Sequence, residues 1–214
     1  MMNGVTIASK TVGRLSLYRR LLESSIPGGR EHVFSHELAV LACVTPAQVR
    51  RDLMSTGCSG SPGRGYRTRD LIEGISMILD DPEGQRAALV GVGNLGRAIL
   101  SYFSGRRPNL RITASFDTDP QKTGRVINGC RCHPMSELGE VLGRESISTA
   151  ILAVPASRAQ ETTDLLVAAG IRGILNYAPV PLRVPEGVFL EERDMTMSLE
   201  TVAFFARRAT MERK

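Results

Sequence analysis

The sequence has 214 residues, of which 42% are hydrophobic, so the chain can form one large domain or two smaller ones with buried cores. Four cysteines are too few for a disulfide scaffold in a chain of this length, which favours a reducing compartment. No apolar run is long enough to cross a bilayer and no signal peptide is recognised, so we expect a cytoplasmic protein that does not contact a membrane.

The excess of positive charge lies in the N-terminal third. Residues 1–69 contain ten basic and four acidic side chains, whereas the remainder contains seventeen basic and eighteen acidic ones. A basic segment of this kind attracts the phosphate backbone of a nucleic acid or an anionic membrane surface. A solvated basic face would have the same composition, so charge alone leaves these alternatives open.

The N-terminal third has the pattern of a helix-turn-helix. After a polar stretch over residues 1–13, which we expect to be frayed, "RLSLYRRLLESS" from Arg14 has helical apolar spacing. A second helix follows in "SHELAVLAC", with Ser35 as its predicted N-cap. A third begins after a short break, where Thr45 is suited to capping and Pro46 to the first helical position. Helix, short turn and helix in this order are typical of DNA-binding proteins.

A flexible segment and a further helix complete this third. "CSGSPGRGY" is rich in Gly, Ser and Pro, which favours the tip of a hairpin, or wing. "TRDLIEGISMIL" predicts another helix, and "DDPEG" predicts a linker, which places the domain boundary near residues 80–85. The first domain is therefore expected to be a winged helix.

From residue 87 onward, strands alternate with helices. The predicted strands are "AALVGV", "LRITASFDTD", "STAILAVP" and "RGILNYAP". The predicted helices are "NLGRAILSYF", "PMSELGEVLG", "ASRAQETTDLLVAAG" and, near the end, "MSLETVAFFARRA". Alternation of this kind predicts an α/β domain with a doubly wound parallel sheet of the Rossmann type.

A glycine-rich turn joins the first of these strands to its helix. In "GVGNLG", Gly91 is expected to form the tight turn, Gly93 to let a pyrophosphate approach, and Gly96 to let the helix pack on the strand. The free N–H groups at the start of the helix would bind the phosphates. Asp117, twenty-one residues after Gly96, is placed to bind ribose hydroxyls and to repel a 2′-phosphate. We therefore expect NAD(H), although Lys122 could favour a phosphate.

Two later strands end in a proline, in "ILAVP" and "LNYAP". Ligands bind at such strand ends in open α/β sheets, so both are expected to line the nicotinamide half, although they could be plain strand terminators. The predicted cofactor-binding residues are Gly91, Val92, Gly93, Asn94, Leu95, Gly96, Asp117, Lys122, Val154, Pro155, Asn176, Ala178 and Pro179.

Catalytic machinery is not recognised. A dehydrogenase needs a proton donor beside the nicotinamide, but His32 and His36 lie in the basic segment, and His133 is predicted in a loop after "CRC". Cys130, Cys132 and His133 lack a second group of ligands, so no metal site is predicted. Cys58 in the wing is interpreted as a free cysteine, with a reactive thiol as the alternative. We expect no enzymatic activity.

The sequence resembles the Rex family of redox-sensing transcriptional repressors from about Arg14 to Phe205. The resemblance rests on "VTPAQVRRDL", "GVGNLGRA", "FDTDP", "AILAVPA", "AAGIRGILNYAPVPLRVPEGV" and "RDMTMSLETVAFF". It implies a homodimer that binds a two-fold symmetric operator DNA and that NADH releases. It also implies a winged-helix DNA-binding domain over 1–82, an NAD(H)-binding Rossmann domain over 83–196 and a C-terminal dimerisation helix over 197–214, swapped between subunits.

The resemblance also implies site residues. In "TPAQVRRDL", Ala47, Gln48 and Arg51 would read bases and Arg50 would bind phosphate, although Gln48 and Arg51 could simply lie on an exposed helix face. The expected DNA-binding residues are Ser35, Thr45, Ala47, Gln48, Arg50, Arg51, Arg64 and Tyr66. Arg20, Tyr102 and Asp194 would form a polar group that switches between the oxidised and reduced cofactor.

The wing departs from the family's pattern. "STGCSGSPGRGY" keeps its glycines, Arg64 and Tyr66 but lacks the usual aromatics and some of the charge. Three functions therefore stay open. The first is an NADH-responsive repressor, the second is a diverged paralogue that binds NAD(H) with weak or lost DNA binding, and the third is a small NAD-dependent oxidoreductase.

Overall fold

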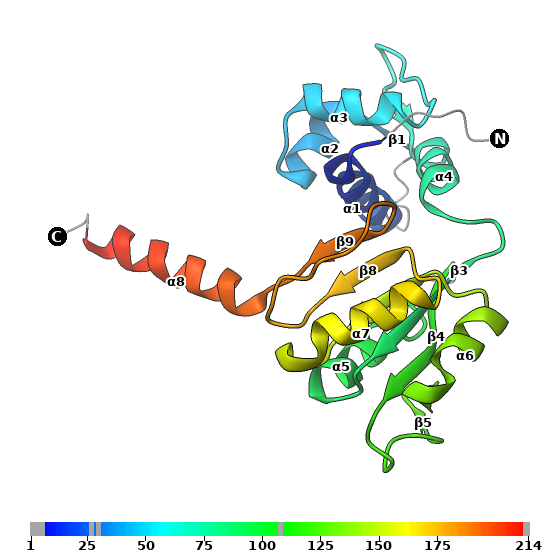
Figure 1. Cartoon of the computed structure of the whole chain (residues 1–214). Helices are drawn as coiled ribbons and strands as arrows, with labels where there is room; N and C mark the ends of the chain where they lie inside the picture. Colours follow the sequence, from blue (N-terminus) through cyan, green and yellow to red (C-terminus); the bar gives the residue numbers. More distant parts are fainter. Residues whose placement is uncertain (1–6, 26–27, 29–30, 107–108, 212–214) are drawn as a thin grey trace. The chain divides into compact units, whose positions relative to one another are not determined.

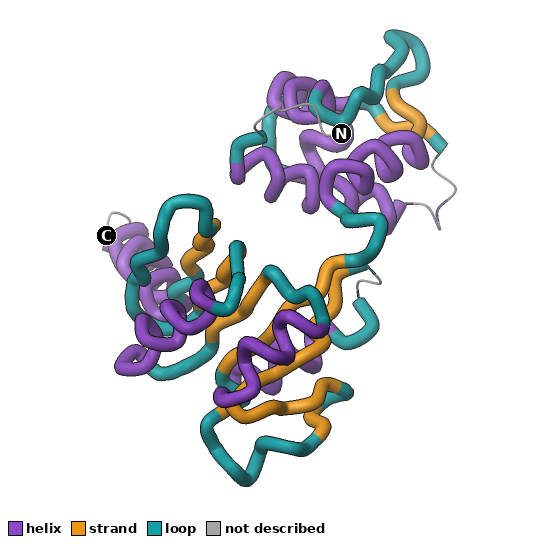
Figure 2. The backbone as a smooth tube through the Cα atoms, turned by 45° about the vertical axis from the view of Figure 1, so that its right-hand side comes forward, coloured by secondary structure: helices purple, strands orange, loops and turns teal. Residues whose placement is uncertain are grey.

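The computed structural model describes residues 7–25, 28, 31–106 and 109–211. The chain divides into two compact units, Met1–Pro82 and Glu83–Lys214, and each has its own buried core. Figure 2 shows that the first unit is mostly helical, whereas strands and helices alternate in the second. Each unit is described by itself below.

The first unit is a winged helix, as predicted. Its elements are α1 (Ser9–Ser25), β1 (His32–Val33), α2 (Ser35–Ala42), α3 (Pro46–Met54), β2 (Tyr66–Arg67) and α4 (Thr68–Leu79). The two strands pair antiparallel, with His32 opposite Arg67. All four helices contribute to one core, in which Leu15, Leu38 and Leu53 are almost fully buried.

The first helix starts earlier than predicted. Residues 1–13 were expected to be frayed, yet α1 begins at Ser9 and includes Thr11. The Thr11 N–H donates to the Ala8 carbonyl, and Arg14 Nη2 donates to Thr11 Oγ1 at 3.1 Å. These bonds hold the polar first turn in helical form, although it buries little apolar surface.

The second unit contains a seven-stranded sheet in the order β5-β6-β4-β3-β7-β8-β9 (Figure 1). Every neighbouring pair is parallel except β5 and β6. The elements in chain order are β3 (Gln85–Val90), α5 (Asn94–Phe103), β4 (Leu110–Asp117), β5 (Val126–Ile127), β6 (Cys130–Pro134), η2 (Met135–Glu137), α6 (Leu138–Arg144), β7 (Thr149–Leu152), α7 (Ala156–Ala168), β8 (Gly173–Asn176), β9 (Phe189–Glu192) and α8 (Met195–Met211).

Helices cover both faces of this sheet, which confirms the doubly wound class. Successive residues of β3 point to opposite faces, so Val90 packs in the cluster that contains α6 and α7, whereas Leu89 packs in the cluster that contains α5. The central strands are buried on both sides, and Ala88 and Leu152 are fully buried.

Three strands of the second unit were not predicted, namely β5, β6 and β9. Residues Cys130–Pro134 form β6 rather than the expected loop, because Cys130 and Cys132 alternate with exposed Arg131 and pair with the edge of β4. A segment of five residues was too short for its alternation to outweigh the glycine and the prolines as loop signals. In β9, two apolar residues precede two glutamates, and the strand is held by its pairing with β8 rather than by apolar periodicity.

The last helix contributes no buried residue to the core of its own unit. None of the residues of α8, coloured orange to red in Figure 1, is buried. Its apolar side chains include Leu199, which is 70% exposed, and Val202, which is 65% exposed. Met195, Leu199 and Val202 are spaced four and three residues apart, so they share one face of the helix. Within the described part of the chain, no helix combines the length and apolar character needed to cross a membrane.

Candidate functional site

The glycine turn after β3 has the geometry of a nucleotide-binding turn. Gly91 has a φ of 93°, in the left-handed region that favours glycine, and its N–H donates to the Phe116 carbonyl of β4 at 2.9 Å. A Cβ on Gly96 would collide with the Gly91 carbonyl oxygen, so the backbone of the first turn of α5 packs directly against the glycine turn. A Cβ on Gly93 would meet no atom within 4 Å, so this residue leaves open space above the turn.

A cavity of about 770 Å³ opens beside this turn, at the carboxyl ends of the parallel strands. Its size and position suit a dinucleotide, since ligands of open α/β sheets bind at this edge and such pockets commonly measure hundreds of cubic ångströms. Its walls contain nine of the predicted residues, namely Gly91, Gly93, Asn94, Leu95, Asp117, Lys122, Val154, Pro155 and Pro179.

Four predicted cofactor residues do not line the cavity. Val92 is fully buried below the turn, and Gly96 is buried against it. Asn176 is also fully buried, and its Nδ2 donates to Glu192 Oε2 at 2.6 Å and to the Val180 carbonyl at 2.9 Å. Ala178 donates its N–H to Asn176 Oδ1. These two residues fasten the loop after β8, so any influence on a ligand would act through Tyr177 and Pro179.

Asp117 lines the cavity, but its carboxylate is largely buried and is already hydrogen-bonded within the protein. It is 9% exposed, and its carboxylate accepts hydrogen bonds from the Val92 N–H at 2.8 Å, the Asp119 N–H at 2.9 Å and Lys122 Nζ at 3.0 Å. Burial alone would raise the pKa of Asp117, but these three donors hold it below its usual value. The carboxylate thus ties the loop after β4 to the glycine turn, and Thr118 is the exposed neighbour that lines the cavity.

Sequence reasoning missed one wall of the cavity. Four side chains of α7 line it, namely Arg158, Glu161, Thr162 and Leu165. Their spacing of three, one and three residues places them on one helix face, which is a signal that the sequence did contain. Further lining residues that were not predicted are Val90, Thr118, Asp119, Met135, Ala153 and Tyr177.

In the first unit, α3 has a capped start and carries exposed basic side chains in its second half. Thr45 is the N-cap, as predicted, and its Oγ1 accepts from the Gln48 N–H at 3.2 Å. Arg50 and Arg51 are exposed, and so is Ala47. A helix whose start offers N–H groups and a positive dipole end, with two exposed arginines further along, suits contact with DNA.

The prediction that Ser35 caps α2 is wrong. The N-cap is Phe34, whose N–H donates to Glu37 Oε2 at 2.8 Å, and Ser35 is the first helical residue. The long Glu37 side chain satisfies the helix end that a serine was expected to satisfy. Ser35 instead accepts a hydrogen bond from Arg50 Nη1 at 3.2 Å, which links α2 to α3.

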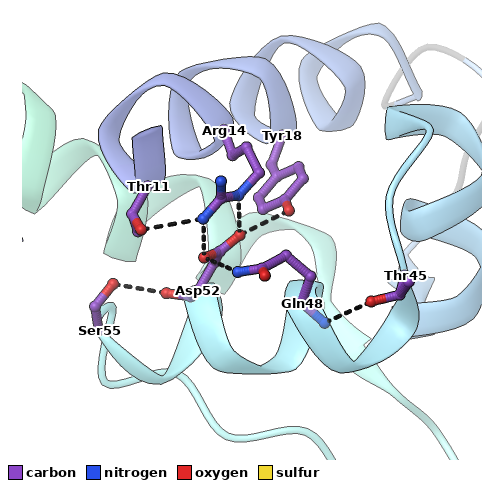
Figure 3. Close-up of polar contacts among 7 residues, drawn as sticks. All are labelled: Thr11, Arg14, Tyr18, Thr45, Gln48, Asp52 and Ser55. Atoms are coloured by element: carbon purple, nitrogen blue, oxygen red, sulfur yellow. Dashed lines mark hydrogen bonds and ion pairs between the residues drawn. The ribbon is translucent and has the colours of Figure 1, made fainter. Parts of the chain in front are cut away.

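Gln48 does not lie free on the helix surface. Its Nε2 donates to Asp52 Oδ1 at 2.8 Å, one turn later on α3 (Figure 3). Asp52 is 2% exposed and also accepts from Arg14 and from the hydroxyl of Tyr18, at 2.9 Å for the latter. Burial alone would raise the pKa of Asp52, but its hydrogen bonds from Arg14, Tyr18 and Gln48 hold it below its usual value.

The wing is a short, closed hairpin tip. Ser61 and Gly65 form an antiparallel bridge, and Gly65 has a φ of 71°. Arg64 is exposed at this tip, whereas Tyr66 is half-buried in the domain core, with its ring below Gly60. Tyr66 therefore supports the wing from beneath.

The three residues of the predicted switch lie in different units. Arg20 is exposed on α1 of the first unit. In the second unit, Tyr102 is 52% exposed and its ring lies 4.3 Å from the guanidinium carbon of Arg106. Asp194 accepts from the Met197 N–H at 2.8 Å, so it caps the start of α8.

Cys58, Cys130, Cys132 and His133 belong to packing, whereas Cys43 is exposed. Burial raises the pKa of the Cys130 and Cys132 thiols, which disfavours the thiolate. Cys58 is half-buried and its Sγ lies 3.3 Å from the Asp70 carbonyl oxygen, and His133 Nδ1 lies 2.9 Å from Glu137 Oε2. Among the described residues, no group of three or more His, Cys, Asp or Glu could hold a metal ion.

A winged helix joined to a Rossmann unit with a nucleotide-sized cavity defines a transcription regulator that responds to a dinucleotide. Two family models match the chain, "CoA binding domain" over residues 83–180 and "Putative DNA-binding protein N-terminus" over residues 6–53.

Curated relatives match nearly the whole chain. The "Redox-sensing transcriptional repressor Rex" of Lactobacillus acidophilus is 38% identical over 204 residues, which cover 95% of this chain and 97% of that protein. The Rex protein of Roseiflexus sp. is 41% identical over 197 residues, with coverage of 92% and 90%. The chain belongs to the Rex family of redox-sensing transcriptional repressors.

Solved structures match over the same length. RSP, a Rex-family repressor, in complex with β-NAD⁺ and operator DNA has a TM-score of 0.87 and 30% identity, covering 98% of this chain and 96% of that one. RSP in complex with β-NADH has a TM-score of 0.82 at the same identity, covering 98% of both chains.

Proposed function

We propose that this chain is a transcriptional repressor that binds operator DNA as a homodimer and is released when NADH occupies its Rossmann unit. It acts by binding rather than by catalysis. The observation that carries the proposal is the match over 98% of the chain to a repressor crystallised with β-NAD⁺ and operator DNA. The cavity beside the glycine turn supplies the cofactor site that this function needs.

NAD(H) is the proposed ligand of the cavity. Its pyrophosphate would lie over Gly93 and the first N–H groups of α5, where no Cβ obstructs it. Asp117 would select against a 2′-phosphate by its negative charge and by fixing the loop with Lys122, rather than by free access to the ribose. Val154, Pro155 and Pro179 would line the nicotinamide half.

Operator DNA is the proposed partner of α3 and the wing. Ala47, Gln48 and Arg51 would face base edges in the major groove, while Arg50, Ser35 and Thr45 would contact phosphates. Arg64 would reach the DNA from the tip of the wing, supported by Tyr66. A chain that binds chromosomal operators works where the chromosome lies, so we place it in the cytoplasm.

A second copy of the chain is the proposed partner of α8. Its apolar face, with Leu199 70% exposed, would be covered in a swapped dimer. Two copies would present two α3 helices to successive major grooves. The oxidation state of the nicotinamide would then change the spacing of the two α3 helices through Arg20, Tyr102 and Asp194. A change of about 5–150-fold in DNA affinity between the two cofactor states suffices for such regulation.

A gel-shift measurement on DNA from upstream of the chain's own gene tests this function. We expect a specific complex without cofactor or with NAD⁺, and its loss on addition of NADH. A paralogue without DNA binding would show no complex in any state. An oxidoreductase would turn over hydride without a shift in mobility.

A further inference from the structure

Four hydrogen bonds converge on the Asp52 carboxylate, although Asp52 lies on the helix proposed to read DNA. Figure 3 shows its carboxylate turned toward α1, where Arg14 Nε donates to Oδ2 at 2.6 Å and Arg14 Nη2 donates to Oδ1 at 2.8 Å. A paired, planar contact of this kind fixes both carboxylate oxygens in direction as well as in distance. Tyr18 adds a third donor, on Oδ2.

The fourth donor connects this buried group to the DNA-facing side of the helix. Gln48 Nε2 donates to Asp52 Oδ1, and the backbone N–H of Gln48 is held by Thr45 Oγ1. A glutamine amide has two N–H donors and one carbonyl acceptor. One N–H is used by Asp52, which leaves the carbonyl oxygen and the second N–H in a fixed orientation.

We propose that Asp52 is a positioning residue for sequence recognition, which holds the amide of Gln48 ready to pair with an adenine edge. An adenine presents N7 as acceptor and N6 as donor in the major groove, and the remaining groups of Gln48 complement both. Without Asp52, the Gln48 side chain would sample several rotamers. Binding to a base would then have to restrict it to one rotamer, at a cost in conformational entropy. The proposal rests on the proposed repressor function, because it requires α3 to enter the groove.

The same contacts could serve stability alone, so the test measures base preference. The wild-type chain first selects a duplex from a randomised double-stranded library. Kd is then measured, at one salt concentration, for the selected duplex and for a duplex in which the selected A·T pair is changed to G·C. The ratio of the two Kd values is the base preference. We expect a preference of roughly tenfold for one good contact. Asp52→Asn and Gln48→Ala should each abolish it, and the double variant should be no worse than either.

A matched control separates positioning from stability. Asp80→Asn breaks another ion pair of the same unit, in which Arg19 Nη1 of α1 lies 2.7 Å from Oδ2 of Asp80 at the end of α4. It should lower the thermal midpoint and leave the base preference unchanged. If Asp52→Asn also lowers the midpoint with an unchanged preference, or if the losses of the two single variants add in the double variant, the proposal is wrong.

Gln48→Glu gives a second test if Asp52→Asn does not fold. A carboxylate at position 48 would be repelled by Asp52, so base preference should be lost at that position. If the side chain at position 48 contacts the base independently of Asp52, the glutamate would instead change the preference to cytosine, because the N4 amino group of cytosine donates to carboxylates. That change would overturn the proposal. A wild-type chain that selects no sequence at all would contradict the repressor function itself, and this outcome is distinct from the others.

Discussion

The carbonyl oxygen of Gly91 lies where a Cβ would project from Gly96, so the turn and the helix after it are in backbone contact. Gly91 also has a φ of 93°, which few other residues adopt. The first turn of α5 is therefore brought to the edge of the cavity by the absence of two side chains.

Gly96→Ala should lower both stability and cofactor binding. The added methyl group displaces either the turn or α5, and overpacking of this kind costs about 1–3 kcal/mol of unfolding free energy. Denaturant unfolding and titration with NADH, followed by its fluorescence, measure the two effects. A variant with unchanged unfolding and unchanged NADH affinity would show that the contact at Gly91 yields easily.

Gly93→Ala is the matched variant with the opposite expectation for stability. Nothing lies within 4 Å of the added Cβ, and the backbone at this helix cap is extended, with φ −79° and ψ −163°. Unfolding free energy should change by no more than about 1 kcal/mol. NADH affinity should fall at least tenfold if the pyrophosphate lies over this residue. Unchanged affinity would place the phosphates elsewhere.

The sequence was most informative where local chemistry decides the structure. Thr45 and Pro46 predicted the start of α3 because a cap and a preset φ act within one turn. The glycine turn and the strands around it were predicted for the same reason, since apolar runs and glycines are local signals. In contrast, Ser35 was assigned as a cap from its residue type, although Glu37, three residues after Phe34, was a local signal for a helix that starts one residue earlier.

Contacts between distant residues were the part that could not be predicted. Asn176 looked like a ligand residue at a strand end, but Glu192, sixteen residues later, binds its amide. Asp117 looked free to bind ribose, but the loop that follows folds back and surrounds it with donors. Asp52 attracted no attention, because its partner Arg14 lies 38 residues away on another helix, and no local pattern links the two.

Arg51→Ala and Arg50→Ala should weaken DNA binding in different ways. Loss of a base contact from Arg51 should cost about 1–3 kcal/mol on the selected duplex and relax its preference at one position. Loss of a phosphate contact from Arg50 should weaken all duplexes alike and lower the salt slope by about 1. Fluorescence anisotropy over a range of salt concentrations measures both. Equal losses on specific and random DNA for Arg51→Ala would assign it to phosphate.

The first unit should lose stability in acid through Asp52. The folded state holds the pKa of Asp52 below its ordinary value of 3.8, so the unfolded state binds more protons as pH falls. Its contribution is therefore complete above that ordinary value and is lost as pH falls through the folded-state pKa. Unfolding free energy, measured from about pH 6 to pH 3, should decline, and the decline should be shallower in Asp52→Asn. The exposed Glu140→Gln provides the control, and equal slopes in all three proteins would contradict the expectation.

Val202→Asp should convert a dimer into a monomer. Val202 is 65% exposed on the apolar face of α8, and a carboxylate buried in a dimer interface would be left without a partner. Sedimentation should show half the mass, and specific operator binding should fall because only one half-site is held. Thr201→Asp places the same charge on another face of the same helix and should leave the mass unchanged. If both variants stay dimeric, another surface joins the subunits.

The bare face of α8 has a consequence for how much of this protein a cell must make. Because none of the 17 residues of α8 is buried, a newly synthesised chain exposes the apolar face of this helix until it binds a second chain. Assembly then depends on the square of the copy number, so a modest fall in synthesis removes active repressor more than proportionally. Gene dosage thus becomes a second input, beside the coenzyme, to the expression of its targets.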